Sequence, residues 1–382
     1  SEEGLTDGDP DSDPNATLDT TNSTTASGQI DFSDPDTTDT HIVTLSEPAT
    51  PLSSGGETIT WTGDGTNTLT GSTSAGTVIE ISIDNAGNYD VSLSQPIDHP
   101  DDTTEDVQSF GVTVTVDDQN GGTDTATLTI GVEDDQPYVE DDSASVGEED
   151  GNTLLVIDPI VYGADGPADT DAVTITDDVD QGDLTYNGDG TFSYDPQGAF
   201  DDLAAGETDS VSFTYQVEDA DGDTDTATVT ITINGDNDPP VINLDPNVSD
   251  LSARVSEEGL PAGDPDSDPN ATLDTTDSTT ASGQIVFSDP DTTDTHLVTL
   301  SEPATPLASG GETITWTGDG TNTLVGSTTS AGEVIRIEID NSGNYDVTLS
   351  GPIDHPDDTT EDVQSFGVTV TVDDQNGGTD TA

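Results

Sequence analysis

The sequence lacks cysteine and lysine, and its only basic residues are Arg254 and Arg336. Without cysteine, no disulfide can hold a domain together and no thiol chemistry is possible. Against the two arginines stand 82 acidic residues, which gives a net charge of −80 at pH 7. Such a field repels nucleic acids and anionic membrane surfaces, and no apolar run approaches the ~20 residues of a membrane helix. We therefore expect neither nucleic-acid binding nor membrane insertion.

Apolar residues are also scarce, at 28% of the chain, and aromatic residues make up only 4%. Low hydrophobicity combined with high net charge is the usual signature of disorder. However, the apolar residues fall into short alternating runs such as HIVTL, TITWT and SFGVTVTV. These runs indicate a folded protein, so something must neutralise many like charges.

The chain contains a long internal repeat. Residues Ser1–Ala126 return as Ser256–Ala382 with 13 substitutions and one inserted residue. In the segment 78–84 the three isoleucines are kept, whereas two of the residues between them change in the second copy. Kept and changed positions alternate with a period of two, which predicts a β-strand with one buried and one solvated face.

Turn signals such as DNAGN, NGDG and DADGD separate many short strands, and no run has the helical period. This pattern predicts an all-β protein made of tandem Ig-like or cadherin-like antiparallel β-sandwiches in a linear array. Two acidic strings closed by proline, at residues 132–137 and 234–240, mark boundaries, because proline cannot continue a strand ladder. They are called the first and the second proline-closed string. We predict module A1 at 1–136, module B at 137–238 and module A2, a copy of A1, at 239–382. Module A1 is expected to lack its first strand and module A2 its last, unless another chain supplies them.

Long strings carry a family resemblance. IDNAGNYDVSLSQPIDHPDDTTEDVQSFGVTVTVDDQNGGTDTATLTIGVEDDQP in module A1 resembles the extender repeats of type I secreted giant bacterial adhesins, the RTX adhesins. GDGTFSYDP, FTYQVEDADGDTDTATVTITI and GDNDPP in module B resemble bacterial cadherin-like or VCBS-type modules. The resemblance implies a secreted, cell-surface protein whose tandem modules are calcium-rigidified extenders in cell adhesion and biofilms.

The acidic residues themselves suit calcium, which takes six to eight oxygen ligands from carboxylates, amides and carbonyls. Aspartate outnumbers glutamate by 63 to 19. Aspartate is short and tolerates turn geometry, so the excess favours ligands placed in turns. Two unit charges at ~4 Å repel by about 4 kcal/mol at an effective dielectric of ~20, so a few close pairs would exceed the stability of a domain. Divalent ions would remove that repulsion.

The second proline-closed string, with Asp236, Asn237 and Asp238, is the sharpest candidate calcium site. Acids that flank a short junction repel one another unless an ion bridges them. An ion there could also take ligands from the preceding strand-turn-strand segment, namely Glu218, Asp219, Asp221, Asp223 and Asp225.

The other candidates lie in the first proline-closed string and in the last hairpins of the two A modules. They are Glu133, Asp134, Asp135, Asp141, Asp142, Asp117, Asp118, Asn120, Asp124, Asp373, Asp374 and Asn376. Weaker candidates are Asp9–Asp13, Asp264–Asp268, Asp34, Asp36, Asp289, Asp291, Glu2, Glu3, Glu148–Asp150, Glu257 and Glu258. For each of them the alternative is a solvated acidic turn that holds no ion.

Other chemistry is thin. The four histidines occur once per copy at two positions, and we expect structural or turn roles for His41, His99, His296 and His355. Trp61 and Trp316 are predicted in the core or on an edge strand, with sugar stacking as the functional alternative.

The sequence therefore predicts a non-enzymatic structural extender whose partners are neighbouring repeats of the same chain. The alternatives are a filament subunit that exchanges strands with other copies and a polysaccharide-binding module.

Overall fold

The computed structural model describes residues 1–6, 8, 20–99, 106–168, 170–263, 276–356 and 362–382. These residues form β-strands and one 3₁₀ helix, Glu257–Gly259. Among them, no helix is long and apolar enough to cross a membrane. They divide into two compact units, unit 1 (1–145, 152–195 and 210–232) and unit 2 (146–151, 196–209 and 233–382). The predicted fold class, tandem antiparallel β-sandwiches, is confirmed.

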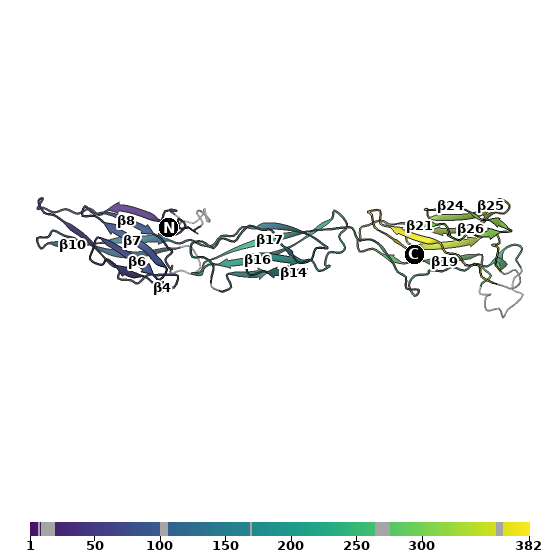
Figure 1. The fold of residues 1–382 in the computed structure, drawn as a ribbon, viewed down its shortest axis with the longest axis horizontal. Coiled ribbons are helices and arrows are strands. Elements are labelled where there is room, and N and C mark those ends of the chain that lie inside the picture. Colours follow the sequence, from purple (N-terminus) through teal and green to yellow (C-terminus); the bar gives the residue numbers. More distant parts are fainter. Residues whose placement is uncertain (7, 9–19, 100–105, 169, 264–275, 357–361) are drawn as a thin grey trace. The chain divides into compact units, whose positions relative to one another are not determined.

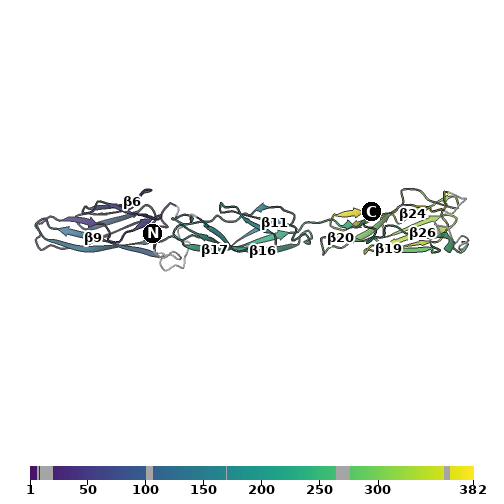
Figure 2. The same ribbon diagram turned by 90° about the horizontal axis from the view of Figure 1, so that it is seen from below.

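Module A1, in unit 1, has two main sheets that enclose one core (Figures 1 and 2). The five-stranded sheet has the order β1-β8-β7-β6-β5, with β1 (Thr25–Gln29), β5 (Thr60–Thr62), β6 (Thr68–Thr73), β7 (Gly76–Ile83) and β8 (Asn88–Leu93). The three-stranded sheet has the order β10-β9-β2, with β2 (Ile42–Ser46), β9 (Val107–Asp117) and β10 (Thr123–Glu133). A short hairpin joins β3 (Ser53–Ser54) to β4 (Glu57–Thr58).

Strand β7 has the alternation that the repeat predicts. Ile79, Ile81 and Ile83 are buried, whereas Glu80 is exposed. The buried side chains of β7 pack against those of the opposite sheet, such as Val112, in a single core. The core is thus built by period-two burial, which leaves the acidic side chains to the outer faces and the loops.

Module B also has two sheets. The four-stranded sheet has the order β11-β17-β16-β13, with β11 (Asp142–Gly147), β13 (Val173–Asp177), β16 (Thr208–Glu218) and β17 (Thr224–Asn234). The three-stranded sheet has the order β12-β15-β14, with β12 (Thr153–Leu154), β14 (Asp183–Tyr186) and β15 (Phe192–Asp195). Its core is aromatic: the Phe192 ring lies 4.9 Å from that of Phe213 and 5.0 Å from that of Tyr215.

Module A2, in unit 2, repeats the strand order of A1. Its five-stranded sheet is β19-β27-β26-β25-β24, with β19 (Thr280–Gln284), β24 (Thr315–Thr317), β25 (Thr323–Thr328), β26 (Gly332–Ile339) and β27 (Asn344–Leu349). The other sheet is β21-β28-β29, with β21 (Leu297–Ser301), β28 (Thr369–Asp373) and β29 (Thr379–Thr381). Two short pairs join β18 (Val241–Ile242) to β20 (Phe287–Ser288) and β22 (Ala308–Ser309) to β23 (Glu312–Thr313).

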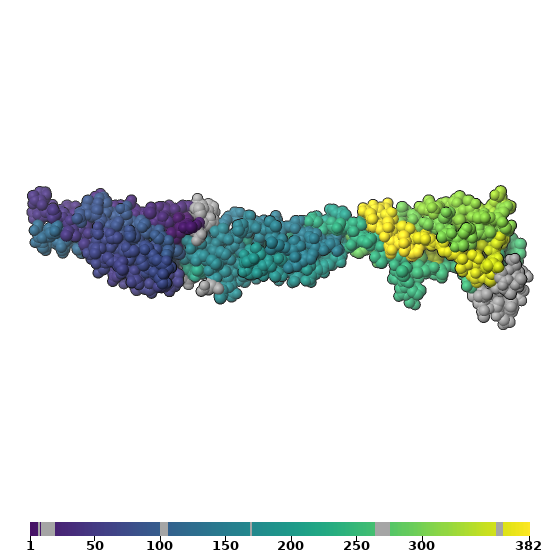
Figure 3. Space-filling view, in the orientation of Figure 1, coloured from purple at the N-terminus to yellow at the C-terminus, as the bar shows by residue number. Residues whose placement is uncertain are grey.

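The hairpin of β28 and β29 is shorter than its counterpart of β9 and β10. In module A1 the segment 107–112 pairs with residues 128–133 of β10, and the counterparts of 128–133 are not in the sequence, which stops at Ala382. The segment 362–368 is not a strand. The last residues lie on the surface of unit 2, in yellow in Figure 3.

Candidate metal centres

The first acidic cluster, in unit 1, gathers around the end of β10. We define it as Glu2, Asp134, Asp135, Asp165, Asp219 and Asp221. The turn between β16 and β17 places Asp219, whose Oδ1 accepts hydrogen bonds from the backbone N–H groups of Gly222 (2.9 Å) and Asp223 (2.7 Å). Ligand oxygens of Asp134, Asp165 and Asp221 all lie within 4.8 Å of one another. Three chain segments distant in sequence thus bring carboxylates to one point.

Several of these carboxylates are buried without a hydrogen-bond donor for every oxygen. Glu2 is 0% exposed, and Asp134 and Asp219 are each 1% exposed. The buried oxygens without a donor are Glu2 Oε2, Asp134 Oδ2, Asp165 Oδ2, Asp219 Oδ2 and both Oδ atoms of Asp221. A buried carboxylate in this situation must be protonated or must bind a cation.

The pKa values report the same crowding. Burial, together with the charges of Asp221 and Glu2, raises the pKa of Asp134 to about 8 against the opposing effect of the nearby His99. Burial also raises the pKa of Asp219 and of Asp165, and further acidic neighbours add to both shifts. Without an ion, these carboxyl groups avoid mutual repulsion by staying protonated and therefore neutral. A divalent ion would allow them to ionise.

The loop that carries Asp165 packs closely against the first proline-closed string. Asp135 Oδ2 accepts a hydrogen bond from the Ala164 N–H at 2.7 Å, which ties the loop that carries Asp165 to the first proline-closed string. Gly163 has a φ of +75°, and a Cβ on it would lie 2.8 Å from the carbonyl oxygen of Asp135. Only glycine suits this position, because other residues rarely adopt that φ and a side chain would collide with the string.

One edge of the first cluster contains a histidine. His99 Nδ1 lies 2.6 Å from Asp106 Oδ1, and His99 Nε2 lies 3.4 Å from Glu2 Oε1 and 3.8 Å from Asp134 Oδ1. Burial opposes protonation of His99, but the hydrogen bond with Glu2 and the charges of Asp134 and Glu2 outweigh it and raise its pKa to about 9. Glu2 is also held by the Ile97 N–H, which donates to its Oε1 at 2.7 Å.

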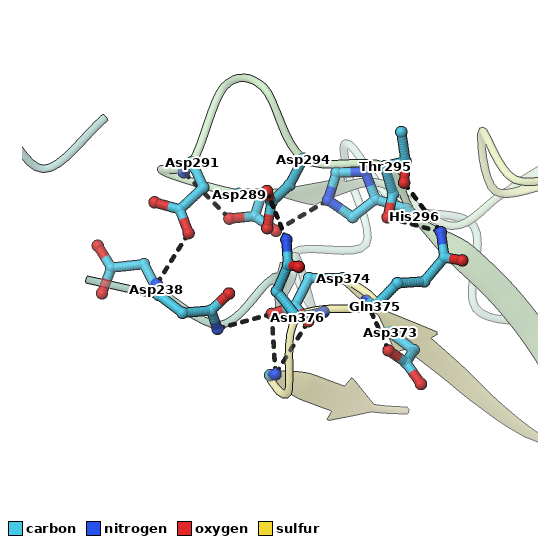
Figure 4. Close-up of polar contacts among 12 residues, drawn as sticks. Asp238, Asp289, Asp291, Asp294, Thr295, His296, Asp373, Asp374, Gln375 and Asn376 are labelled. Carbon is cyan, nitrogen blue, oxygen red and sulfur yellow. Dashed lines mark hydrogen bonds and ion pairs between the residues drawn. The ribbon is translucent and has the colours of Figure 1, made fainter. Parts of the chain in front are cut away.

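The second acidic cluster lies in unit 2. Its centre is Asp289, Asp294 and Asp374, whose ligand oxygens lie within 4.8 Å of one another. Asp374 Oδ1 accepts hydrogen bonds from three successive backbone N–H groups, those of residues 376 to 378, at 2.7–2.9 Å. Figure 4 shows these carboxylates beside Asn376, whose Nδ2 donates to Asp294 Oδ1 at 2.8 Å.

Residues of the second proline-closed string are bound to this cluster. Asn237 Nδ2 donates to Asp374 Oδ2 at 3.0 Å, and the Asp238 N–H donates to Asp291 Oδ2 at 2.9 Å. The Asp236 N–H donates to Glu148 Oε1 at 2.6 Å. Buried oxygens without a donor are Asn237 Oδ1, Asp291 Oδ1, Asp294 Oδ2 and Glu148 Oε2.

The third acidic cluster is the counterpart of the second in module A1. Ligand oxygens of Asp34, Asp39 and Asp118 lie within 4.8 Å of one another, and Asn120 Nδ2 donates to Asp39 Oδ2 at 2.7 Å. All three aspartates are half-buried. Hydrogen bonds from the backbone N–H groups of Asn120 and Gly122 hold the pKa of Asp118 below its ordinary value.

The structure brings together many of the candidates from the sequence and separates others. The candidates that join a cluster are Asp134, Asp135, Asp219, Asp221, Asn237, Asp238, Asp118, Asn120, Asp374, Asn376, Asp34, Asp289, Asp291, Glu2 and Glu148. Asp223 is buried in the same turn as Asp219. Glu3 in module A1 and its counterpart Glu258 in module A2 each have a buried Oε2. Asp9–Asp13 and Asp264–Asp268 lie outside the described residues.

The following candidates do not join a cluster and make other contacts or are exposed. Glu133 accepts hydrogen bonds from the backbone N–H groups of residues 20 and 21. Asp117 and Asp373 accept bonds within their own turns. Backbone N–H groups also donate to Asp141, Asp142 and Asp225, and Glu218, Asp236 and Asp36 are exposed.

One expectation needs correction. The hairpin from Glu218 to Asp225 was expected to supply ligands at Asp236–Asp238, but it joins Asp134 and Asp165 instead. Strand β17 spans 11 residues between that hairpin and Asn234, and at about 3.3 Å per residue this separates the two acidic groups by roughly 35 Å.

Sequence reasoning missed Asp165, Asp39 and Asp294. Asp165 lies in a Gly-Ala-Asp-Gly loop that resembles any other turn. Asp39 and Asp294 follow the SDPD strings by three residues, and their nearness to the last hairpin of each module exists only in the fold.

The side chains of Trp61, His41 and His296 make contacts of a structural kind. Trp61 lies on the edge strand β5, half-buried against the core, with its ring 6.3 Å from that of Phe110. His41 and His296 each contact one aspartate, Asp34 at 3.1 Å and Asp289 at 2.8 Å.

The donor set of the acidic clusters fits calcium. It consists of carboxylate and amide oxygens, which are the ligands of hard cations, in groups large enough for six or more contacts when backbone carbonyls and waters are included. Glu2, Asp134, Asp165, Asp219 and Asp221 would hold an ion in the first cluster, and Asp289, Asp291, Asp294, Asp374 and Asn237 in the second.

One segment of the chain matches a known family. Residues 134–235 match the bacterial cadherin-like domain, whereas no curated protein matches the sequence. Mouse cadherin-23 repeats EC22–24 are 13% identical over 90% of this chain and 97% of theirs, with a TM-score of 0.36. Human CDH23 repeats EC21–23 are 11% identical over 91% and 88%, with a TM-score of 0.34. The chain covers 51% of the protocadherin gammaB4 extracellular domain, at 12% identity over 90% of this chain and a TM-score of 0.32. These similarities concern the fold alone.

Proposed function

We propose that this chain is a non-enzymatic, calcium-dependent extender segment of a secreted adhesin or extracellular filament. Calcium in the first and second acidic clusters stiffens the chain where modules meet, and the modules supply reach between a surface anchor and a distal binding part. The protein serves cell adhesion and biofilm formation at the cell surface. Its function is mechanical, so its partners are the neighbouring repeats of the same chain.

The buried oxygens of the first cluster carry this proposal. Asp221 presents two buried oxygens without a hydrogen-bond donor, and Asp134, Asp165 and Asp219 present one each. Mutual repulsion of such groups opposes folding, and a divalent ion converts it into a stabilising contact. The bacterial cadherin-like match at residues 134–235, which includes most of this cluster, supports the adhesion role.

The test compares thermal unfolding and small-angle scattering of the full chain in calcium and after removal of divalent ions. One site at a hundredfold excess of calcium over its Kd stabilises by about 2.7 kcal/mol, and for a unit of this size that shifts Tm by on the order of 5–10 °C. We expect a Tm loss of this size and a shorter mean length when calcium is removed. An unchanged Tm and length would contradict the proposal.

A matched pair of variants separates site loss from charge loss. Asp221→Asn removes a cluster ligand, whereas Asp90→Asn removes an exposed charge from β8. We expect weaker calcium binding for Asp221→Asn alone. Magnesium and high sodium chloride are the ionic controls. Charge screening by monovalent salt would stabilise both variants equally, because it does not depend on a particular site.

A further inference from the structure

His99 is the feature that calcium does not explain. Its side chain and that of Glu2 are both 0% exposed, and the side chain of Asp134 is 1% exposed. Calcium prefers oxygen ligands, whereas an imidazole nitrogen suits zinc and similar ions. A buried nitrogen that faces two carboxylates therefore differs chemically from the rest of the first acidic cluster.

The contacts of His99 Nε2 are longer than those of a tight ion pair. A charge-assisted hydrogen bond between a histidine and a carboxylate is typically 2.7–2.9 Å long, but His99 Nε2 lies 3.4 Å from Glu2 Oε1 and 3.8 Å from Asp134 Oδ1. Ligands at 2.0–2.2 Å from a tetrahedral ion are separated from one another by about 3.4 Å. His99 Nε2 is therefore separated from the two carboxylate oxygens by distances close to those between ligands of a small ion, and longer than a short charge-assisted hydrogen bond.

The second nitrogen of the ring has the partner that a metal-bound histidine needs. His99 Nδ1 lies 2.6 Å from Asp106 Oδ1. A carboxylate in that position fixes the Nδ1–H tautomer and directs the Nε2 lone pair toward the metal. The oxygens that face His99, Glu2 Oε1 and Asp134 Oδ1, also accept hydrogen bonds from the backbone N–H groups of Ile97 and Asp135. The second oxygen of each carboxylate is buried without a donor and remains for a cation.

We propose that Glu2, His99 and Asp134 form a binding site for a borderline divalent ion such as zinc, separate from the calcium position and sharing Asp134 with it. Asp134 belongs to both groups of convergent ligands, one with Glu2 and His99 and the other with Asp165 and Asp221. The fourth position around the ion is taken by water or by another oxygen of the cluster. The site goes beyond the calcium proposal, because it concerns a different ion and a nitrogen ligand.

Module A2 offers a control within the same chain. His355 has the same two neighbours as His99, with Nε2 3.4 Å from Glu257 Oε1 and Nδ1 beside Asp362, but its side chain is 30% exposed and that of Glu257 is 36% exposed. The position that corresponds to Asp134 falls beyond residue 382 of this sequence. Among the described residues, His355 thus has the carboxylate partner and one ligand, but it is less buried than His99.

The experiment follows the histidine side-chain nitrogens of the full, ¹⁵N-histidine-labelled chain by NMR during titration with zinc chloride, in saturating calcium. Calcium occupies the many weaker acidic sites, and the chain has only four histidines to resolve. We expect one equivalent of zinc to move the Nε2 resonance of His99 alone. Calorimetry should give a zinc affinity at least tenfold weaker for His99→Gln and unchanged for His355→Gln.

Three results would overturn the inference. They are equal shifts of all four histidines, wild-type zinc affinity in His99→Gln, and no zinc binding while calcium is present. The histidine resonances of the unaltered chain decide the question even if His99→Gln does not fold. Zinc bound at His99 without any calcium effect on Tm would leave this inference intact and would contradict the proposed function alone.

Discussion

Asp118 and Asp374 occupy the same position in the two copies of module A, but their surroundings differ. Asp374 is 0% exposed because Asn237 and the rest of the second proline-closed string lie against it, whereas Asp118 is half-buried. The same holds for Asp291, which is buried, and its counterpart Asp36, which is exposed. The sequence of module A places these acids, and the preceding string buries them.

The other end of module A shows the reverse pattern. Glu2 in the first copy is buried against His99 and Asp134, whereas the side chain of Glu257 in the second copy is 36% exposed. In the first copy, Asp165 and Asp221 of module B converge on Asp134 and complete the cluster. Each end of module A therefore carries half of a candidate metal centre, and an adjoining module supplies the other half.

The largest expected effect is a pH dependence of stability that arises from Asp134 in the first cluster. Burial raises the pKa of Asp134 from 3.8 to about 8 in the folded, metal-free chain. The folded state therefore binds the proton more tightly, so this stabilisation is complete below about pH 4 and is lost as the pH rises through about 8. Each unit of pKa difference corresponds to about 1.4 kcal/mol. We expect the Tm of the metal-free chain to fall between about pH 4 and about pH 8.

Two variants sharpen this contrast. Asp134→Asn should reduce the slope of Tm against pH. Asp374→Asn should leave it unchanged, because hydrogen bonds from Asn237 and the backbone hold the pKa of Asp374 below its ordinary value despite burial. In excess calcium the slope should reverse, since protons then compete with the ion for the carboxylates. An equal slope in wild type and Asp134→Asn would contradict the assignment.

The fold followed from the sequence because its signals are local. The alternation around Ile79, Ile81 and Ile83 reports burial directly, and the turn strings mark where strands end. The clusters were predicted only in part, because their members converge from separate loops. Asp165 gave no local signal, and the partners of Asp219 depend on which end of β17 each acid occupies.

Neighbours in sequence also proved poor guides to shared sites. Glu133, Asp134 and Asp135 are consecutive, yet Asp134 and Asp135 are buried and Glu133 turns to the backbone of residues 20 and 21. Glu133 is the last residue of β10, whereas Asp134 and Asp135 follow the strand. A run of acids therefore contributes only part of its members to one ion.

The next largest effect is expected from neutralising the shared position in each copy. Asp374→Asn replaces a buried acceptor of several N–H groups with an amide, and in calcium we expect a loss of about 2–3 kcal/mol in unfolding free energy. Asp118→Asn removes a half-buried charge, so its effect should be smaller. Thermal unfolding and calcium calorimetry of both variants check the order. Equal losses would show that the second proline-closed string adds nothing to the site.

The smallest effect concerns the glycines that let these aspartates accept backbone hydrogen bonds. A Cβ on Gly378 would lie 2.2 Å from Asp374 Oδ2 and 2.7 Å from the Cα of Pro239. A Cβ on Gly122 would lie 2.4 Å from Asp118 Oδ2, and its three nearest atoms all belong to the Asp118 side chain. The Asp118 side chain is half-buried and can rotate away, but Asp374 is enclosed. Overpacking of this kind costs roughly 1–3 kcal/mol where nothing can move.

We therefore expect Gly378→Ala to lower calcium affinity and Tm, and Gly122→Ala to change them little. The two substitutions add the same methyl group to equivalent hairpins of the two copies, so a difference between them reports what lies against each hairpin. Unfolding and calcium titration of the two variants in the full chain measure that difference directly. If Gly122→Ala were as damaging as Gly378→Ala, each hairpin turn would be rigid by itself. Burial by the second proline-closed string would then not be what completes the second cluster.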